Sequence, residues 1–169
     1  MIVKAYFYPL FVAALGSVWA SGAAAAGLKV KTLAGVPSTL VEQLKINRHT
    51  VVMIWTTYCG VCKRDYPVLS AFHNAHVGRD AEVLGVSLDG YAELAAVQAF
   101  VAKGAFSFPT VIAEAEDMAQ GFEKATGEKF TGTPTYLVFD QHRALVGARS
   151  GDITRDALET YLRNQSRPQ

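Results

Sequence analysis

The chain has 169 residues, which suits one domain with an appendage and argues against two full-sized domains. Half of the residues are hydrophobic, 18% are charged and the formal net charge is +1, which excludes an acidic disordered tail and gives no support to a basic nucleic-acid binder. Lys4 is the one charged residue among the first 20, so 15 basic residues face 15 acidic ones in a formally neutral body. A body of this size can bury roughly 68–70% of its unfolded surface in one core, and it needs neither a metal nor a disulfide to fold.

The first 20 residues have the pattern of an export signal. Lys4 precedes an uncharged apolar run over 5–18, and Val18-Trp19-Ala20 offers a cleavage site, with Ala24-Ala25-Ala26 as a second one. An uncleaved membrane anchor is the alternative, because 5–28 carries no charge and about 20 apolar residues span a bilayer. Its second half consists of Ala, Gly and Ser, which are weakly apolar for such a span. We therefore expect residues 1–20 to be a signal peptide, or an N-terminal anchor, of an exported protein.

Beyond a linker at 21–27, residues 28–165 are predicted to form one domain of alternating strands and helices. Two continuous apolar runs, 50–55 and 82–88, are typical of parallel strands that are buried on both faces. The other strands are predicted at 28–32, 108–112, 135–139 and 144–148. Helices are predicted at 40–44 after a Ser38 cap, at 61–77, 91–101 and 114–125, and after a cap at Asp152 or Thr154. This order predicts an α/β fold with a mixed sheet that helices cover on both faces.

The body has two cysteines, Cys59 and Cys62, which form a C-x-x-C pair. A structural disulfide between them would close a very short loop, where the entropic gain is smallest. A zinc site would need two further ligands, and His73 and His76 lie ~16 Å along a helix from Cys62, too far to share one ion. A reversible dithiol is the third interpretation, and the position of the pair between a strand and a helix favours it.

The chemistry of a reversible dithiol fits this position. Cys59 follows a buried strand and begins a helix, where unpaired N–H groups and the helix dipole favour a thiolate. Such a thiolate attacks a partner disulfide to form a mixed disulfide, which the neighbouring thiol of Cys62 then resolves.

The residues around the pair resemble a known active site. Residues 55–63, Trp-Thr-Thr-Tyr-Cys-Gly-Val-Cys-Lys, look like the active-site segment of the thioredoxin superfamily. The continuation over 64–69 resembles the exported TlpA/ResA-like branch, which includes the cytochrome c maturation thioredoxins; Asp65 and Pro67 match an acidic residue and a proline that are common there. Gly132-Thr133-Pro134-Thr135 resembles the cis-proline loop that lies opposite the cysteines in this superfamily.

This resemblance covers nearly all of the exported body and implies its fold. The expected architecture is thioredoxin-like: a mixed central sheet flanked by helices on both faces, with a βα-type insertion, at about 114–130, before the cis-proline loop. The resemblance also implies a redox-active disulfide between Cys59 and Cys62.

Three residues depart from the superfamily pattern. Val61 stands where many members have proline, and Tyr58 replaces the commoner tryptophan. Met53, six residues before the first cysteine, occupies the position of the buried acid of thioredoxin. The classical proton acceptor is therefore missing, and Asp65 becomes the candidate for a catalytic role. A partly buried carboxylate three residues after Cys62 would have a raised pKa and could accept its proton, although an acid that only complements the helix dipole is the alternative.

Four further residues are candidates for substrate binding. A cis Thr133–Pro134 bond would present the backbone of Thr133 to a substrate segment beside Cys59, and an ordinary proline at the start of a strand is the alternative. Trp55 and Tyr58 are expected to form an apolar collar around the cysteines, with plain core packing as the alternative for Trp55.

The resemblance implies an enzyme, an exported or periplasmic thiol–disulfide oxidoreductase that reduces disulfides in envelope proteins. Apocytochrome c is one candidate substrate, and a membrane electron donor would keep the dithiol reduced because the compartment is oxidising. We expect no cofactor, no metal and no nucleic acid, and a monomeric chain. The same residues would also serve an oxidase or an isomerase.

Two other functions compete with this one. A peroxiredoxin-like peroxidase shares the fold but normally lacks this C-x-x-C. A copper-binding chaperone or assembly factor would hold Cu(I) through the two soft thiolates, although such proteins usually have a wider cysteine spacing and a ligating histidine. The sequence assigns no site to its histidines: His49 and His142 are expected at turns or strand ends, and His73 and His76 on a solvated helix face.

Overall fold

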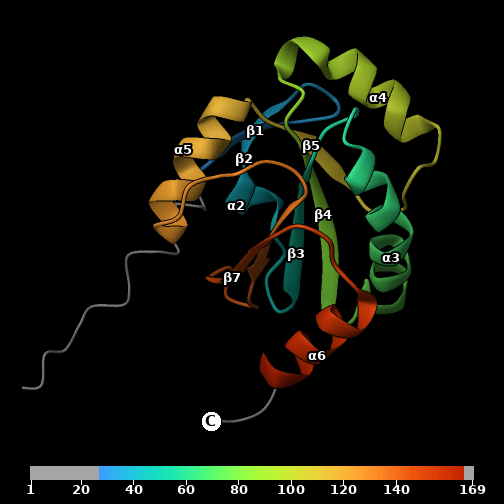
Figure 1. Ribbon diagram of the computed structural model, residues 1–169, viewed down its shortest axis with the longest axis vertical. Helices are drawn as coiled ribbons and strands as arrows, with labels where there is room; N and C mark the ends of the chain where they lie inside the picture. The colour runs from blue at the N-terminus through green and yellow to red at the C-terminus, as the bar shows by residue number, and fades with distance from the viewer. Residues whose placement is uncertain (1–26, 166–169) are drawn as a thin grey trace, which may run out of the picture.

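The computed structural model describes residues 27–165, and the predicted signal peptide and most of the linker lie outside this range. A single seven-stranded sheet runs through the molecule in the order β2-β1-β5-β4-β3-β6-β7 (Figure 1). Its three central strands, β5, β4 and β3, are parallel, and the outer strands join them antiparallel. The predicted mixed sheet is confirmed.

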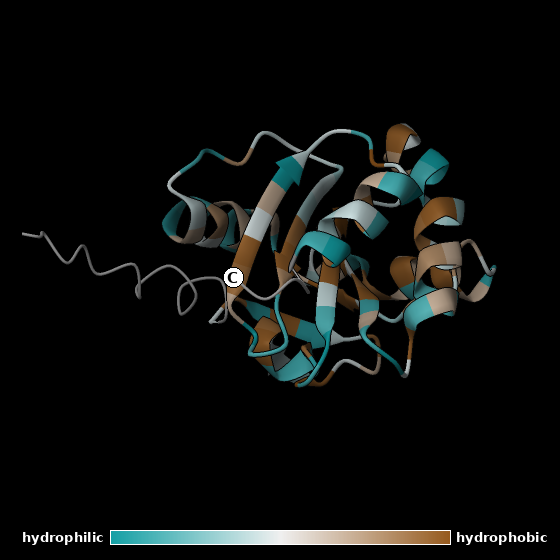
Figure 2. Ribbon diagram, turned by 90° about the horizontal axis from the view of Figure 1, so that it is seen from below, coloured by the Kyte–Doolittle hydropathy of each residue, from teal (hydrophilic) through white to brown (hydrophobic). Residues whose placement is uncertain are grey.

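The two apolar runs form the centre of the sheet. Strands β3 (His49–Trp55) and β4 (Ala81–Ser87) pair in parallel over their whole length, and nearly every side chain in them is buried. Figure 2 shows these hydrophobic residues, coloured brown, along the strands between the helices. The other strands are β1 (Lys29–Thr32), β2 (Pro37–Thr39), β5 (Thr110–Ile112), β6 (Thr135–Phe139) and β7 (Leu145–Ser150).

Helices cover both faces of the sheet, as the sequence predicted (Figure 1). One face packs against α2 (Leu40–Gln43) and α5 (Ala115–Thr126), which is the predicted insertion before the proline loop. The other face packs against α3 (Gly60–His76), α4 (Leu94–Ala102), which the short 3-10 helix η1 (Tyr91–Glu93) precedes, and α6 (Arg155–Gln165). Thr154 caps α6, because its hydroxyl accepts the N–H of Ala157. Among the described helices, none is long and apolar enough to cross a bilayer.

The start of α2 differs from the prediction. Ser38 does not cap this helix but lies in β2, which forms an antiparallel hairpin with β1. Thr39 is the cap, and its N–H donates to the carboxylate of Glu42 at 2.8 Å. The hairpin was missed because the three residues of β2 carry no alternating pattern of their own.

The prediction of a solvated face for His73 and His76 is wrong, because both side chains are buried. The Nδ1 atom of His73 accepts the N–H of Val83 at 3.1 Å, at a part of β4 that β5 does not reach. His76 bridges α3 and α6, with Nδ1 2.8 Å from Asp80 and Nε2 3.2 Å from Glu159. The periodicity of α3 alone could not show that α6 folds back over its last turns.

The bridge at His76 makes stability depend on pH. Burial acts to lower the pKa of His76, but hydrogen bonds and charges from Asp80 and Glu159 outweigh it and raise that pKa above 6.5. Stability from a raised histidine pKa is fully present below the unfolded value and is lost as pH rises through the folded one. We expect the free energy of unfolding lost in His76→Gln to be larger at pH 5.5 than at pH 8, by about 1 kcal/mol.

Urea unfolding of the wild type and the variant at several pH values measures this difference. Glu159→Gln, which removes one charge facing the ring, is the matched variant and should flatten the same dependence in part. A loss in His76→Gln that is equal at every pH would contradict the charged bridge. Burial lowers the pKa of His73, so this residue makes stability rise with pH instead of fall. Both proteins contain His73, so its effect cancels in the comparison.

Candidate active site

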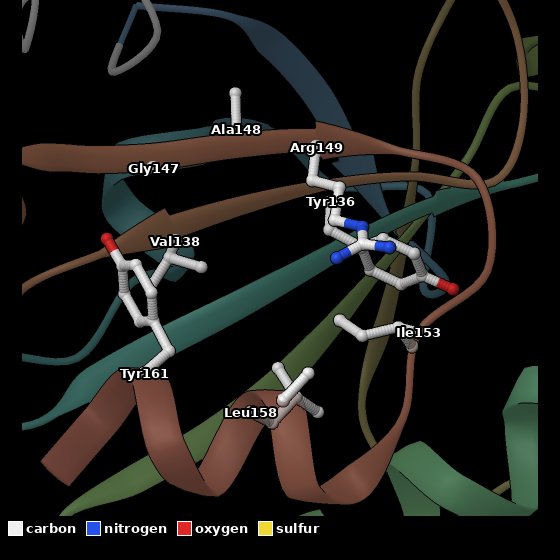
Figure 3. A pocket seen from close by; sticks show the side chains of 9 residues that line it. Tyr136, Val138, Gly147, Ala148, Arg149, Ile153, Leu158 and Tyr161 are labelled. Carbon is white, nitrogen blue, oxygen red and sulfur yellow. The ribbon is translucent and has the colours of Figure 1, made fainter. Parts of the chain in front are cut away.

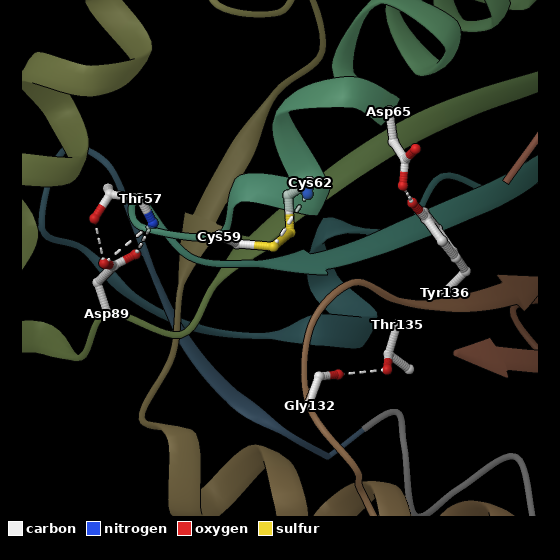
Figure 4. The surroundings of a disulfide bond; sticks show 8 residues. All are labelled: Thr57, Cys59, Cys62, Asp65, Asp89, Gly132, Thr135 and Tyr136. Carbon is white, nitrogen blue, oxygen red and sulfur yellow. Dashed lines mark hydrogen bonds between the residues drawn. A yellow bond between two sulfur atoms is a disulfide. The ribbon is translucent and has the colours of Figure 1, made fainter. Parts of the chain in front are cut away.

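Cys59 and Cys62 lie where β3 meets α3, and they are disulfide-bonded with their Cα atoms 5.3 Å apart (Figure 4). Cys59 is the N-cap of α3 and Cys62 lies in its first turn. The N–H of Cys62 donates to the Sγ atom of Cys59 at 3.1 Å. An N–H in this position would also stabilise a negative charge on that sulfur once the disulfide is reduced.

The two cysteines differ in how deeply they are buried. Cys59 retains 8% of its surface, whereas Cys62 retains none. Tyr58 and Val61, which flank Cys59, are exposed hydrophobic side chains, Tyr58 with 79% of its surface. A partner molecule would therefore meet Cys59 first, on an apolar rim.

An aromatic cluster supports the cysteines from inside. Trp55, the last residue of β3, is fully buried and packs edge-on against Tyr66 and Phe106, with ring centroids 5.7 and 5.2 Å away. Tyr58 and Trp55 therefore do not form one collar around the cysteines: Tyr58 is at the surface, and Trp55 is in the core beneath them. Any effect of Trp55 on a substrate has to pass through this packing.

A buried acid lies one turn after Cys62 on α3. Asp65 is 4% exposed, and its Oδ2 atom accepts a hydrogen bond of 2.6 Å from the hydroxyl of Tyr136 on β6 (Figure 4). Burial raises the pKa of Asp65, and the charge of Asp152 adds to this, while the bond from Tyr136 and the charge of Arg64 act in the lowering direction. The expected partly buried carboxylate with a raised pKa is present.

The position of Tyr136 relates this acid to the pattern of thioredoxin. Tyr136 is the cross-strand partner of Met53, the residue that stands where thioredoxin has its buried acid. The carboxylate of Asp65 therefore reaches the same region of the sheet from the helix above it. Tyr136 was not predicted from the sequence, because its bond to Asp65 depends on the register between β3 and β6.

Tyr136 also forms one wall of a cavity of about 220 Å³ between α6 and the hairpin of β6 and β7 (Figure 3). Arg149 on β7 is the cross-strand partner of Tyr136, and its side chain lies beside the tyrosine ring. The other walls are mainly apolar, with Val138, Ile153 and Leu158 among them. Tyr136 therefore separates the buried carboxylate of Asp65 from this apolar space.

The predicted proline loop lies at the same end of the sheet as the cysteines. The Thr133–Pro134 peptide bond is cis. Thr135, the next residue, pairs with Ile54, so Pro134 lies beside the end of β3 that leads to Cys59. The hydroxyl of Thr135 donates to Gly132 O at 2.6 Å and the N–H of Gly151 donates to Pro134 O at 3.0 Å, which brace the loop.

A second residue that the sequence did not indicate is Asp89, just beyond β4, whose carboxylate binds Thr57 in the loop before Cys59 (Figure 4). Within residues 27–165, no group of three or more His, Cys, Asp or Glu side chains is arranged to hold a metal ion.

Comparison with known proteins agrees with this geometry. The model of the AhpC/TSA family matches residues 21–147. The chain belongs to the AhpC/TSA family. It is 21% identical over 163 residues to sporulation thiol-disulfide oxidoreductase A of Bacillus subtilis, covering 90% of this chain and 93% of that protein.

Two solved structures show the same fold. One is DsbF of MTB, with a TM-score of 0.66 and 23% identity over 85% of this chain and 98% of the other. The second is a thiol:disulfide interchange protein of Chlorobium tepidum, with a TM-score of 0.64 and 16% identity over 80% and 90% of the two chains. The predicted thioredoxin-like fold is confirmed, and these relatives are consistent with the TlpA/ResA-like branch. The family and the paired cysteines together make this chain a thiol–disulfide oxidoreductase of the thioredoxin-like type.

The buried carboxyl of Asp65 should lower stability at neutral pH. A carboxyl with a raised folded-state pKa contributes its stability below the unfolded value of 3.8 and loses it as pH rises through the folded one. We expect Asp65→Asn, which keeps an acceptor for Tyr136, to raise the free energy of unfolding at pH 7 by about 1 kcal/mol, because the amide has no charge to bury.

Urea unfolding of the oxidised protein between pH 3 and pH 8 checks this expectation. The gain should disappear near pH 3, where the wild-type carboxyl is protonated in both states. Asp156→Asn, at an exposed position on α6, is the control and should change stability little. Loss of stability in Asp65→Asn at pH 7 would contradict the raised pKa.

Proposed function

We propose that this protein is an exported enzyme that reduces disulfides in other exported proteins. The observation that carries the proposal is the geometry of the pair: a disulfide at the start of α3, in which the sulfur of Cys59, the less buried of the two cysteines, accepts the N–H of Cys62. The signal-like residues 1–20 support export. The names of the relatives support thiol–disulfide exchange as the reaction.

In the proposed reaction the reduced enzyme transfers two electrons to a substrate disulfide. The Cys59 thiolate attacks one substrate sulfur, so that a mixed disulfide forms and the other substrate sulfur leaves as a thiolate. Cys62 then gives its proton to Asp65 and attacks Cys59, which releases the second substrate thiolate and forms the Cys59–Cys62 bond. Both substrate thiolates take up protons from the medium.

The surroundings of the pair support a division of labour. Asp65 is the proposed proton acceptor, because it is buried on the helix that carries Cys62 and its pKa is raised. The backbone of Thr133, beside the end of β3, and the exposed ring of Tyr58 are the proposed docking points for a substrate segment. Trp55 is proposed to act from below, by holding the cysteine loop against the core.

We further propose apocytochrome c as a substrate and a membrane protein as the electron donor, both on the resemblance to the cytochrome c maturation thioredoxins. An exported dithiol needs such a donor, since its compartment oxidises thiols. The oxidised pair in the structure is the form that this donor would reduce.

Substitution of one cysteine should trap the reaction half-way. We expect Cys62→Ser to accumulate a mixed disulfide with insulin, whose disulfides are intact, or with an exported substrate. No second thiol is left in this variant to resolve the adduct. Cys59→Ser should form no adduct, because Cys62 is fully buried. Both variants should reduce insulin in the presence of dithiothreitol only at the background rate.

Non-reducing electrophoresis and mass spectrometry detect the adduct, and insulin turbidity measures the activity. A wild type that does not exceed the background rate would contradict the proposal. Consumption of peroxide by a wild type that leaves insulin intact would favour the peroxidase instead.

Asp65 should affect the resolving step selectively. We expect Asp65→Asn to slow insulin reduction at pH 7 by about a hundredfold, which is typical for the loss of a proton acceptor, even though the same variant is more stable. The defect should shrink as pH rises, because the Cys62 thiol then ionises without help. A mixed disulfide that decays at the wild-type rate would show that Asp65 has only a structural role.

A further inference from the structure

The carboxylate of Asp89 binds the loop that carries Cys59. Its Oδ1 and Oδ2 atoms lie 3.2 and 3.0 Å from the backbone N of Thr57, and Oδ1 accepts the Thr57 hydroxyl at 2.6 Å (Figure 4). The hydroxyl of Ser87, at the end of β4, donates to Oδ2. One carboxylate thus receives an N–H and an O–H from Thr57, 32 residues away in the chain, and an O–H from the nearby Ser87.

The hydrogen bonds of Asp89 lie just beyond the last backbone hydrogen bond between β3 and β4. The ladder between β3 and β4 continues to one last bond, from the N–H of Leu88 to Trp55 O at 2.8 Å. Beyond it the chain has only Thr56, Thr57 and Tyr58 before Cys59, and the N–H of Cys59 donates to Thr56 O at 3.2 Å. Asp89 therefore fixes the middle of the segment that sets the position of the Cys59 sulfur.

We infer that Asp89 is a positioning residue for the redox pair, which holds the Cys59 sulfur at the N–H of Cys62 through its bonds to Thr57. The inference deepens the proposed function and rests on it. Without these bonds the segment 56–58 would lose its side-chain anchor to the end of β4. The hydrogen bond from the N–H of Cys62 to the sulfur of Cys59 would then be formed for a smaller fraction of the time.

The same carboxylate carries a negative charge close to the active site. Its charge acts with burial to raise the pKa of Tyr66, which packs under the cysteines against Trp55. A nearby negative charge also disfavours a thiolate at Cys59. Asp89 therefore has two opposite effects on Cys59: its hydrogen bonds favour the thiolate, and its charge opposes it.

Two substitutions separate these effects. Asp89→Asn removes the charge but keeps an oxygen that accepts the Thr57 N–H, whereas Asp89→Ala removes both. Because the loss of charge is common to the two variants, the difference between them reports the hydrogen bonds alone. We expect iodoacetamide to alkylate Cys59 at pH 7 about tenfold more slowly in Asp89→Ala than in Asp89→Asn, in the fully reduced chain.

The pH profile gives a second readout. The midpoint for alkylation should lie below that of the wild type in Asp89→Asn, since the opposing charge is gone, and higher in Asp89→Ala than in Asp89→Asn. Equal rates and equal midpoints in the two variants would overturn the inference. Mass spectrometry assigns the label to Cys59, and thermal unfolding confirms that each variant is folded.

Thr57 provides an independent test from the other side of the contact. Thr57→Val removes the hydroxyl that Asp89 accepts and should slow the alkylation of Cys59 several-fold, and Thr57→Ser should restore the rate. Asp156→Asn, which removes a carboxylate from the exposed first turn of α6, is the charge control. Identical rates in Thr57→Val and Thr57→Ser would contradict positioning by Asp89.

Failure of this inference and failure of the proposed function can be distinguished. Alkylation reports the state of the Cys59 sulfur whether or not the protein reduces other proteins. If the wild type does not reduce insulin but the Asp89 variants differ as expected, the proposed function is wrong and the positioning is right. If insulin is reduced and the variants do not differ, the reverse holds.

Discussion

The contact on which the active site depends is the hydrogen bond from the N–H of Cys62 to the sulfur of Cys59. The first N–H groups of a helix have no partner within it, and here one of them meets a sulfur instead of a conventional cap. The arrangement arises because β3 ends at the buried Trp55 and α3 starts at Gly60, after four connecting residues of which Cys59 is the cap. The fully buried Trp55 fixes the start of that short connection, and the bonds of Asp89 to Thr57 hold its middle.

At the acid near Cys62, stability and the proposed function have opposite requirements. A hydrophobic residue at position 65 would suit a helix face that is packed against the sheet, and the buried carboxyl there has a raised pKa because burial disfavours its charge. The fold limits this cost with one hydrogen bond, from Tyr136. A raised pKa brings the carboxyl closer to the pKa of a thiol, which is the match that proton transfer between them requires.

Most of the fold and the central pair could be predicted because their signals are local. The apolar runs of β3 and β4, the spacing of Cys59 and Cys62, and the Gly-Thr-Pro-Thr segment each lie within a few residues of sequence. The contacts of Tyr136 with Asp65 and of Thr57 with Asp89 join residues 71 and 32 positions apart, and they depend on strand register and on where α3 crosses the sheet. For the same reason His76 was placed in solvent: its partner Glu159 comes from α6, 83 positions away.

Under the proposed reaction the two cysteines need opposite surroundings: Cys59 has to ionise easily, and Cys62 has to keep its proton until an acceptor takes it. Cys59 has to carry a negative charge before it attacks; it is the less buried of the two cysteines, and its sulfur accepts a helix N–H. Cys62 has to stay protonated until the mixed disulfide forms, and complete burial disfavours its anion. Under the proposed reaction its proton then goes to Asp65, which is buried on the same helix. An acid on β3 at position 53 would lie on a separate element, whereas Asp65 lies one turn from Cys62 on the same helix. Under the proposed reaction, the helix itself therefore sets the separation of the acceptor from the resolving thiol.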